Sequence, residues 1–377
     1  MPYGRKEAIL TGMRKEKAPD GRGALTNRSG RFERHTVEPT ADGWEREDEP
    51  PASKTRVTAD STRRIITTND SPDVPFDRSI NPYRGCEHGC VYCFARPSHA
   101  YLGLSAGLDF ETRIYSKPDA AILLRRELAR RGYRADTIAL GANTDPYQPV
   151  EKRLGITRAI LDVFAECRHP VGIVTKSSLI LRDLDLLQRL ATDRLVHVHV
   201  SITTLDPELA RRMEPRAVTP AERLHTISKL SSSGVPVGLL ASPMIPGLND
   251  AEIEAIVKAG ASAGASSAGT IILRLPGEVK ELFEEWLDRH YPLRAAHVLS
   301  LVRGTRDGAL YDSRFGKRMR GSGAYAELIA RRFDAARSRH GLRPRPAPLD
   351  ASLFRPPRAT APQLGLFEEN DDDDLAS

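Results

Sequence analysis

Between about Ser79 and Arg274 the chain alternates short apolar runs with longer amphipathic segments, and no other feature of the sequence constrains the fold as much. Such alternation is typical of parallel strands joined by crossover helices. Six strands in series predict an α/β fold, a partial (βα)6 barrel of the TIM type, with an open doubly wound sheet as the alternative. Thr219 followed by Pro220 indicates the start of one helix. The expected strands are 79–84, 137–142, 171–176, 196–203, 235–242 and 270–275, and the expected helices are 119–131, 154–167, 181–192, 219–232, 250–262 and 278–290.

The fourth expected strand divides its side chains into an apolar face and a polar face. Along residues 196–203 the apolar residues alternate with His197, His199, Ser201 and Thr203. Paired histidines on a strand are also typical of an internal hydrogen-bonded pair. Because the second and sixth strands likewise have a small or polar face, we expect a lumen that holds a ligand. The residues expected to line this reaction chamber are Asn143, His199, Ser201 and Arg274.

The two ends of the chain lack this pattern. Residues 1–70 show no helical or strand periodicity, so we expect a largely disordered basic arm before a barrel domain over 71–292. Residues 293–343 should form a basic extension, since 294–347 carry 13 Lys and Arg against four acidic residues, with a helix at about 321–340. The proline-rich and then acidic tail, residues 344–377, is expected to be disordered.

Composition limits the class of protein and its compartment. No stretch approaches the ~20 apolar residues of a membrane span, and no apolar block of a signal peptide follows the first residues. The sequence therefore predicts a soluble protein of the cytoplasm, with no membrane partner. Four cysteines are too few for a disulfide framework in 377 residues, so thiol chemistry here means metal or redox chemistry.

Three of the four cysteines lie within eight residues. Cys86, Cys90 and Cys93 are spaced C-x3-C-x2-C in a loop that follows the first expected strand. Thiolates are ligands of zinc and of iron–sulfur clusters, and three of them leave one iron of a four-iron cluster with an open coordination position. The alternative is a zinc site completed by His88 or Cys167.

This loop, with an aromatic residue before its last cysteine, resembles the motif of the radical S-adenosylmethionine (SAM) superfamily, and the likeness is nearest to the spore photoproduct lyase branch. The resemblance also covers the segments 144–151, 174–177, 200–202, 214–215 and 240–246. It implies a [4Fe–4S] cluster whose open iron is chelated by SAM, and reductive cleavage of SAM to a hydrogen-abstracting 5′-deoxyadenosyl radical. By the same likeness the cluster ligands are Cys86, Cys90 and Cys93, and the SAM-binding residues are Lys176 at the carboxylate, Ser201 at the ribose, the Tyr92 backbone at the adenine, and Ser242.

The chain departs from the lyases at one position. The lyases carry a cysteine shortly after the second strand that returns a hydrogen atom to the repaired thymine, whereas this chain has residues 141–144, Gly-Ala-Asn-Thr, in that region. Splitting of a thymine dimer by the lyase mechanism is therefore not expected. Tyr147 and Tyr101 are both open as hydrogen donors.

The basic extension and the tail suggest partners. Clustered arginines with interleaved aromatic residues fit a phosphate backbone, which favours nucleic acid. In the tail, Gln363 to Phe367 resembles the peptide by which repair proteins dock on the bacterial sliding clamp. An electron donor is also implied.

Three hypotheses follow from the sequence. The first is a radical SAM enzyme acting on DNA or, second, RNA. Another is a zinc-stabilised nucleic-acid-binding protein without catalysis. The third keeps the radical chemistry but takes a protein or a small molecule as substrate.

Overall fold

The computed structural model describes residues 21–28, 31–32 and 54–357. Within this described part the main sheet has seven strands, in the order β10-β9-β8-β7-β6-β3-β2. The strands β3 and β6 to β10 are mutually parallel, and β2 pairs antiparallel with β3 at the edge. Their bounds are Ile66–Thr68 (β2), Arg78–Ile80 (β3), Ile138–Leu140 (β6), Val171–Thr175 (β7), Val196–Ser201 (β8), Val237–Met244 (β9) and Ser267–Ile272 (β10).

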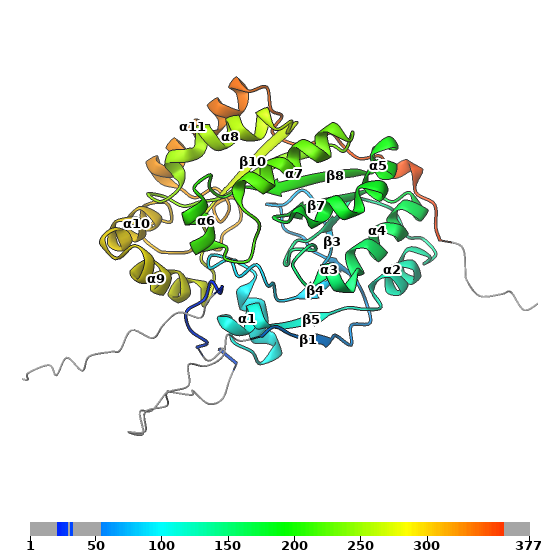
Figure 1. Cartoon of the computed structure of the whole chain (residues 1–377), viewed down its shortest axis with the longest axis horizontal. Helices are drawn as coiled ribbons and strands as arrows, with labels where there is room; N and C mark the ends of the chain where they lie inside the picture. Colours follow the sequence, from blue (N-terminus) through cyan, green and yellow to red (C-terminus); the bar gives the residue numbers. More distant parts are fainter. Residues whose placement is uncertain (1–20, 29–30, 33–53, 358–377) are drawn as a thin grey trace, which may run out of the picture.

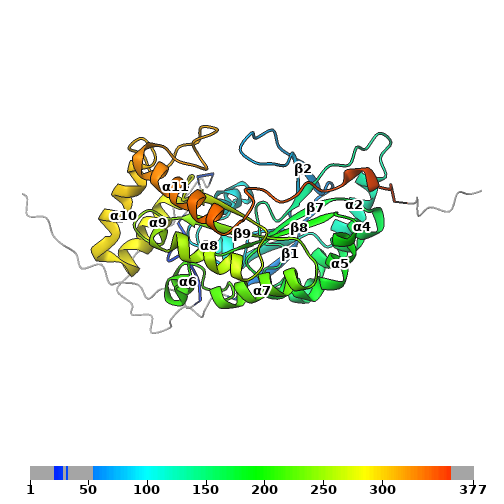
Figure 2. The same cartoon turned by 90° about the horizontal axis from the view of Figure 1, so that it is seen from above.

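The order of the parallel strands distinguishes the two expected architectures. A doubly wound sheet reverses its strand order at a switch point, whereas here the strands follow one another in chain order. The helices between them accordingly lie along one face of the sheet (Figure 2). This is the arrangement of a partial (βα)6 barrel, and it places all six carboxyl ends at one edge, where ligands bind in such folds.

The crossover helices match the expected segments to within a few residues. Helix α7 begins as its sequence predicts, because the Thr219 hydroxyl accepts a hydrogen bond from Glu222 N and Pro220 is the first helical residue. These helices are α2 (Ala120–Leu128), α4 (Ile156–Cys167), α5 (Leu184–Thr192), α7 (Pro220–Ser232), α8 (Ile253–Ser262) and α9 (Val279–His290). Shorter elements are α1 (Leu108–Thr112), α3 (Glu151–Leu154), α6 (Pro207–Met213), and the 3-10 helices η1 (Arg96–Leu102), η2 (Ser178–Asp183), η3 (Asp250–Glu252) and η4 (Ala351–Leu353).

The first expected strand, residues 79–84, is divided into two in the structure. Pro82 lacks a backbone donor and cannot continue the ladder, so β3 ends at Ile80 and β4 (Tyr83–Arg84) turns into a second sheet. There β5 (Arg113–Ser116) pairs antiparallel with β4 and parallel with β1 (Arg56–Ala59). Figure 1 shows this small sheet beside the main one.

The strand faces differ as the alternation predicts. Val198 and Val200 of β8 are fully buried under the helices together with their neighbours Ile173 and Leu239, and form the core. The opposite, inner face carries small and polar residues. For example, the register places Gly172 beside His197 and Gly238 beside His199.

The expectation of a disordered arm over residues 1–70 is wrong for the stretch 54–70, which contains β1 and β2. Both strands are short and largely exposed, so their sequences carry no period-2 apolar signal. Strand β1 is ordered by pairing with β5, which lies far away in the sequence, and β2 by pairing with the nearby β3. Of the rest of the arm, only 21–28 and 31–32 belong to the described residues.

The carboxyl-terminal extension contains the expected basic helix, α11 (Gly323–Arg339), after α10 (Pro292–Gly304). The expectation of disorder from residue 344 onward is wrong for 344–357. In this stretch the Phe354 ring lies 5.4 Å from the Tyr133 ring between centroids, and Arg355 N donates to Cys167 O. The clamp-like segment 363–367 lies outside the described residues.

Much of the positive charge of the extension is neutralised within the fold. Arg318 forms an ion pair with Asp73 at 2.5 Å, and Arg332 forms one with Glu254 at 2.6 Å. Arg314 and Lys317 pair with acidic residues of their own loop. The free positive charge on the surface of the extension is therefore smaller than the number of its basic residues indicates.

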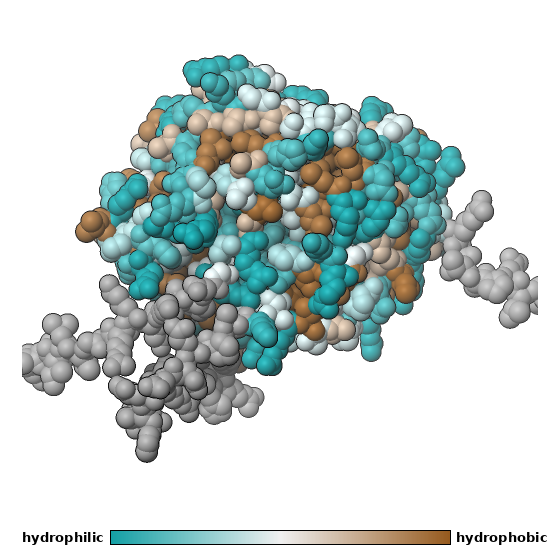
Figure 3. Space-filling model, viewed as in Figure 1, coloured by the Kyte–Doolittle hydropathy of each residue, from teal (hydrophilic) through white to brown (hydrophobic). Residues whose placement is uncertain are grey.

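The surface of the molecule is mixed. On the face shown in Figure 3 it is mostly hydrophilic, with scattered apolar patches over the helices. Among the described residues no helix has both the length and the apolar character that crossing a bilayer requires.

Candidate active site

The cysteine loop lies between β4 and η1, and two glycines shape it. Gly85 and Gly89 have φ of +80° and +68°, a conformation that favours glycine. A Cβ on Gly85 would also lie 2.8 Å from Phe110 O, so no side chain fits there. Cys86 and Cys90 are buried and Cys93 is partly exposed; all three are free thiols.

Two of the three thiols, Cys86 and Cys90, are shielded from water. Burial raises the pKa of Cys86 well above its ordinary value and that of Cys90 to about 12, and the neighbouring thiols add to both shifts. Three reduced cysteines on one tight loop are the donor set that an iron–sulfur cluster requires. Metal binding here must displace thiol protons.

The two candidates for a fourth zinc ligand lie in different places. His88 belongs to the cysteine loop, and its Nδ1 lies 3.4 Å from Asp145 Oδ2. Cys167 ends α4, at the amino edge of the sheet, opposite the edge that the cysteine loop faces. In the part of the chain that the structure describes, no three His, Cys, Asp or Glu side chains are placed to hold one metal ion.

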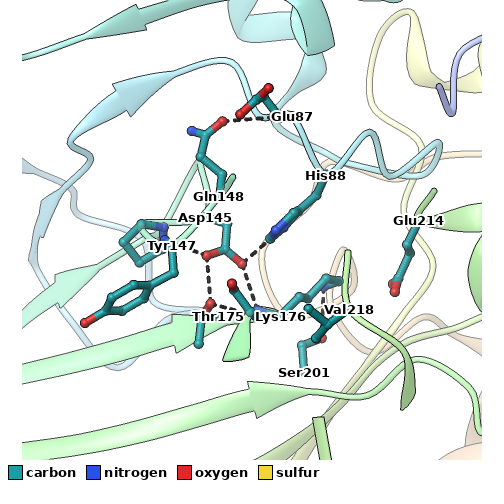
Figure 4. Close-up of polar contacts among 12 residues, drawn as sticks. Glu87, His88, Asp145, Tyr147, Gln148, Thr175, Lys176, Ser201, Glu214 and Val218 are labelled. Atoms are coloured by element: carbon teal, nitrogen blue, oxygen red, sulfur yellow. Dashed lines mark hydrogen bonds and ion pairs between the residues drawn. The ribbon is translucent and has the colours of Figure 1, made fainter. Parts of the chain in front are cut away.

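Asp145, just after β6, joins the cysteine loop to the sheet (Figure 4). Its carboxylate accepts hydrogen bonds from Thr175 Oγ1 and Lys176 N, each at 2.7 Å, and from Tyr147 N at 2.8 Å. Burial opposes ionisation, but the charge of His88 and these hydrogen bonds outweigh it and lower the pKa of Asp145. The sequence resemblance includes this segment without giving Asp145 a role.

The four residues expected at SAM do come together. Lys176 Nζ donates to Ser201 Oγ at 2.9 Å and lies 5.9 Å from the centroid of the Tyr92 ring. Ser201 Oγ donates to Ser242 O at 3.2 Å. The buried Ser242 Oγ has no hydrogen-bond partner within the described chain. An orphaned hydroxyl beside a lysine fits a polar ligand at these strand ends.

The buried ion pair between Glu214 and Arg223 contacts two of these residues, Tyr92 and Ser201. Glu214 accepts hydrogen bonds from Tyr92 OH, from Thr203 Oγ1 at 2.6 Å and from Arg223, whose other amino group donates to Ser201 O at 3.1 Å. Burial disfavours the Glu214 carboxylate, but the charges of Arg223 and Lys176 lower its pKa to about 2. Sequence reasoning missed this role, because Glu214 belongs to the resemblance only as part of a short segment.

The inner face of the sheet holds two histidines. The rings of His197 and His199 contact each other edge to face at 5.3 Å, and each ring lies over a glycine. A Cβ on Gly172 would be 2.7 Å from His197 Nε2, and a Cβ on Gly238 would be 2.8 Å from His199 Cδ2. His199 thus lies on the inner face of the sheet. Asn143 is exposed, and its backbone N donates to Asn81 Oδ1; the described structure shows no hydrogen bond between Asn143 and His199.

These histidines predict an acid-sensitive fold. Burial lowers the pKa of His197 and of His199 to about 4, so between pH 6.5 and 4 the unfolded chain binds more protons than the native one. Stability is complete above pH 6.5 and falls by roughly 2 kcal/mol per ring by about pH 5. Denaturant unfolding at several pH values measures the loss. Replacing both His197 and His199 by Gln should make the free energy of unfolding depend less on pH. Some dependence remains, because burial also lowers the pKa of His169 to about 4. A pH dependence equal to that of the wild type would contradict the role of the two histidines.

Arg274 follows β10 at the mouth of the chamber. Its guanidinium carbon lies 4.0 Å from the centroid of the Phe94 ring, and Phe94, next to Cys93, is 40% exposed. Burial lowers the pKa of Arg274, and the Cys93 thiol is among the groups that act on it. Among the described residues no carboxylate lies within ion-pair distance of Arg274. Asp73, whose pKa is lowered chiefly by a backbone hydrogen bond from Gly316, is also under the influence of the Arg274 charge.

Three comparisons place the chain among known proteins. The sequence profile of the Radical SAM superfamily matches residues 80–259. An uncharacterized protein of Mycobacterium tuberculosis is 38% identical over 232 residues, which is 61% of this chain and 68% of the relative. One of Methanocaldococcus jannaschii is 28% identical over 176 residues, 46% of this chain and 62% of that protein.

Solved structures of one enzyme share the fold. A spore photoproduct lyase complexed with dinucleoside spore photoproduct superimposes with a TM-score of 0.56 at 16% identity, over 76% of this chain and 80% of the lyase. A point mutant of spore photoproduct lyase gives 0.52 at 17% identity, over 75% of this chain and 77% of the mutant. At this identity the likeness shows the fold.

Proposed function

The chain belongs to the radical SAM superfamily and is a radical SAM enzyme, and on that premise we propose that its substrate is a nucleic acid, DNA before RNA. The cofactors of the superfamily are a [4Fe–4S] cluster and SAM. When bound, they supply a one-electron cleavage of SAM that yields a hydrogen-abstracting radical. A one-electron donor is therefore a further partner.

The residues present fit these cofactors. Cys86, Cys90 and Cys93 would hold the cluster, and the orphaned Ser242 hydroxyl and the Ser201 hydroxyl offer polar contacts to SAM. Lys176 has a neutral hydrogen-bond partner instead of a carboxylate, so it can pair with the carboxylate of SAM. Asp145 fixes the Lys176 backbone, and the Glu214–Arg223 pair fixes the strand end at Ser201.

One observation carries the choice of substrate. Arg274 is a half-buried cation without a carboxylate partner in the described structure, and it is stacked on the exposed ring of Phe94 beside the cysteine loop. A guanidinium is suited to a phosphate, and an exposed ring beside it is suited to stacking on a base. Both features of a nucleotide would thus be met at the mouth of the chamber.

The basic extension supports nucleic acid less than the sequence implied, since two of the four arginines of α11 and three basic residues of the preceding loop are ion-paired. The proposal therefore rests on Arg274 and Phe94 and less on charge in α11. The lyase reaction itself is not proposed. Residues 141–144 carry no cysteine, and at Gly141 itself a Cβ would lie 2.6 Å from Pro146 Cδ and 2.9 Å from Val174 O.

The hydrogen donor is not assigned by this geometry. Tyr147 is fully buried in the core, and Tyr101 is 72% exposed on η1.

The nucleic-acid substrate is tested by following the hydrogen atom that the radical abstracts. Anaerobically prepared enzyme with reductant and SAM should move deuterium from a labelled DNA oligonucleotide into 5′-deoxyadenosine. Transfer only from a labelled peptide or metabolite pool would refute a nucleic-acid substrate and support the third hypothesis.

Replacing Arg274 by Ala should weaken binding of a DNA oligonucleotide about tenfold, because one charge-assisted contact to phosphate is lost. Fluorescence anisotropy measures the affinity, and the slope of affinity against salt should become shallower. Arg131→Ala, an equal loss of charge after α2, is the control and should leave binding unchanged. Equal losses in the two variants would mean that the contact is not specific.

A further inference from the structure

A short segment from the N-terminal arm, residues 21–28, packs against the cysteine loop. We call it the N-terminal strap. Within it, Gly23 and Ala24 are buried. Their backbone amides donate to the Glu111 carboxylate at 3.0 and 2.8 Å. The strap is thus held by backbone groups to a side chain of α1.

Glu111 passes this contact on to the cysteine loop through Arg96. The two side chains are fully buried and form an ion pair at 2.5 Å. Arg96 in turn donates to Gly89 O at 3.1 Å and to Cys90 O at 2.9 Å, within the loop that carries the cluster ligands. Glu111 is thus one of the groups that position Arg96 on the loop, together with the carbonyls of Ala106 and Gly107, each 3.0 Å from Arg96 Nη1.

The strap and the loop approach too closely for any side chain. A Cβ on Gly23 would lie 1.7 Å from Gly89 O and 3.3 Å from Val91 N. A Cβ on Gly107 would lie 2.1 Å from Thr26 O. Two glycines that carry no positive φ are thus required by contact alone, one on each side of the crossing.

Further contacts fasten the strap to its surroundings. Arg22 donates to Glu111 O at 3.1 Å and to Thr55 Oγ1 at 3.3 Å. Thr26 Oγ1 donates to Glu285 of α9 at 2.8 Å. The strap therefore connects the cysteine loop to α1 and α9, which the barrel sequence alone does not place beside it.

We propose that the N-terminal strap is part of the cofactor site: it positions the backbone of the cysteine loop through Glu111 and Arg96, and it shields the cluster from oxidants. The inference rests on the proposed cluster at Cys86, Cys90 and Cys93. Partners of this kind, which hold ligands without touching the metal, change metal retention by about 10- to 100-fold when removed. Arg22, Gly23 and Glu111 are positioning residues in this sense.

The test uses the full chain with Gly23→Ala, reconstituted anaerobically beside the wild type. The added methyl group must displace either the strap or Gly89 O. We expect the visible absorption of the cluster to decay in air about tenfold faster, and the electron paramagnetic resonance spectrum of the reduced cluster to change. In the metal-free protein, alkylation of Cys90 should be faster. Gly304→Ala is the matched control, since Gly304, at the end of α10, has no neighbour within 4 Å of a Cβ and no positive φ.

Arg22→Ala is the second variant, because Arg22 is only partly buried and its removal loosens the strap without a steric clash. It should accelerate the decay in air in the same direction as Gly23→Ala. Decay rates and spectra equal to the wild type in both variants would overturn the strap's role while leaving the enzyme assignment intact. A wild-type chain that takes up no iron and sulfide would overturn the proposed cluster and the strap together.

Discussion

Replacing Cys86, Cys90 or Cys93 singly by Ala should remove bound iron and sulfide and lower the rate of SAM cleavage by at least about a hundredfold. Loss of a residue that only supports a metal ligand lowers metal affinity or activity by about 10- to 100-fold, and loss of the ligand itself should cost more. Each substitution removes one of the three thiolates of the loop, and the fourth cysteine of the chain, Cys167, lies at the opposite edge of the sheet. Iron and sulfide analysis, visible absorption and release of 5′-deoxyadenosine measure the loss.

The fourth cysteine is the matched control for this experiment. Cys167→Ala removes an equally free and buried thiol at the opposite edge of the sheet, so iron content and SAM cleavage should stay at the wild-type level. Full iron in Cys86→Ala, or loss of iron in Cys167→Ala, would contradict the assignment. Stoichiometric zinc with no visible absorption in the wild type would instead revive the zinc-stabilised alternative.

Glu214→Gln should lower the free energy of unfolding by about 3–5 kcal/mol, because it leaves the Arg223 guanidinium buried without a counter-charge. Both side chains are almost inaccessible to water. Denaturant unfolding of the metal-free chain measures the loss. Glu254→Gln, which breaks a half-exposed pair with Arg332, is the control and should cost no more than about 1 kcal/mol.

The pH dependence of this pair has a definite sign. The pKa of Glu214 is lowered from 4.5 in the unfolded chain to about 2, so its contribution is complete above pH 4.5 and is lost as the pH falls towards 2. Replacing both partners, Glu214→Leu with Arg223→Met, should recover much of the stability because no charge is then left buried. A double variant as unstable as Glu214→Gln would show that the pair is not the cause.

The periodic and local features were predictable from sequence. The strands, the crossover helices and the start of α7 at Thr219 depend on alternation and capping, which a short window contains. The cysteine loop depends on spacing alone. Lys176, Ser201 and Ser242 could be placed together because all three follow barrel strands whose carboxyl ends share an edge.

Residues whose partners are distant in the sequence were not predictable in the same way. Glu214 meets Tyr92 across 122 positions and Glu111 meets Gly23 across 88, and no periodicity reports either contact. The free charge of the basic extension was overestimated for the same reason, since Asp73 lies 245 positions from Arg318. Strand β1 likewise owes its order to β5 and not to its own sequence.

The glycines beside His197 and His199 let the neighbouring strands meet the two imidazoles with main chain alone. A Cβ on Gly238 would lie 2.5 Å from Ser267 Oγ and 2.8 Å from His199 Cδ2, so Gly238→Ala would have to displace one of these side chains. The orientation of both rings therefore depends on residues that have no side chain and that a search for polar groups would pass over.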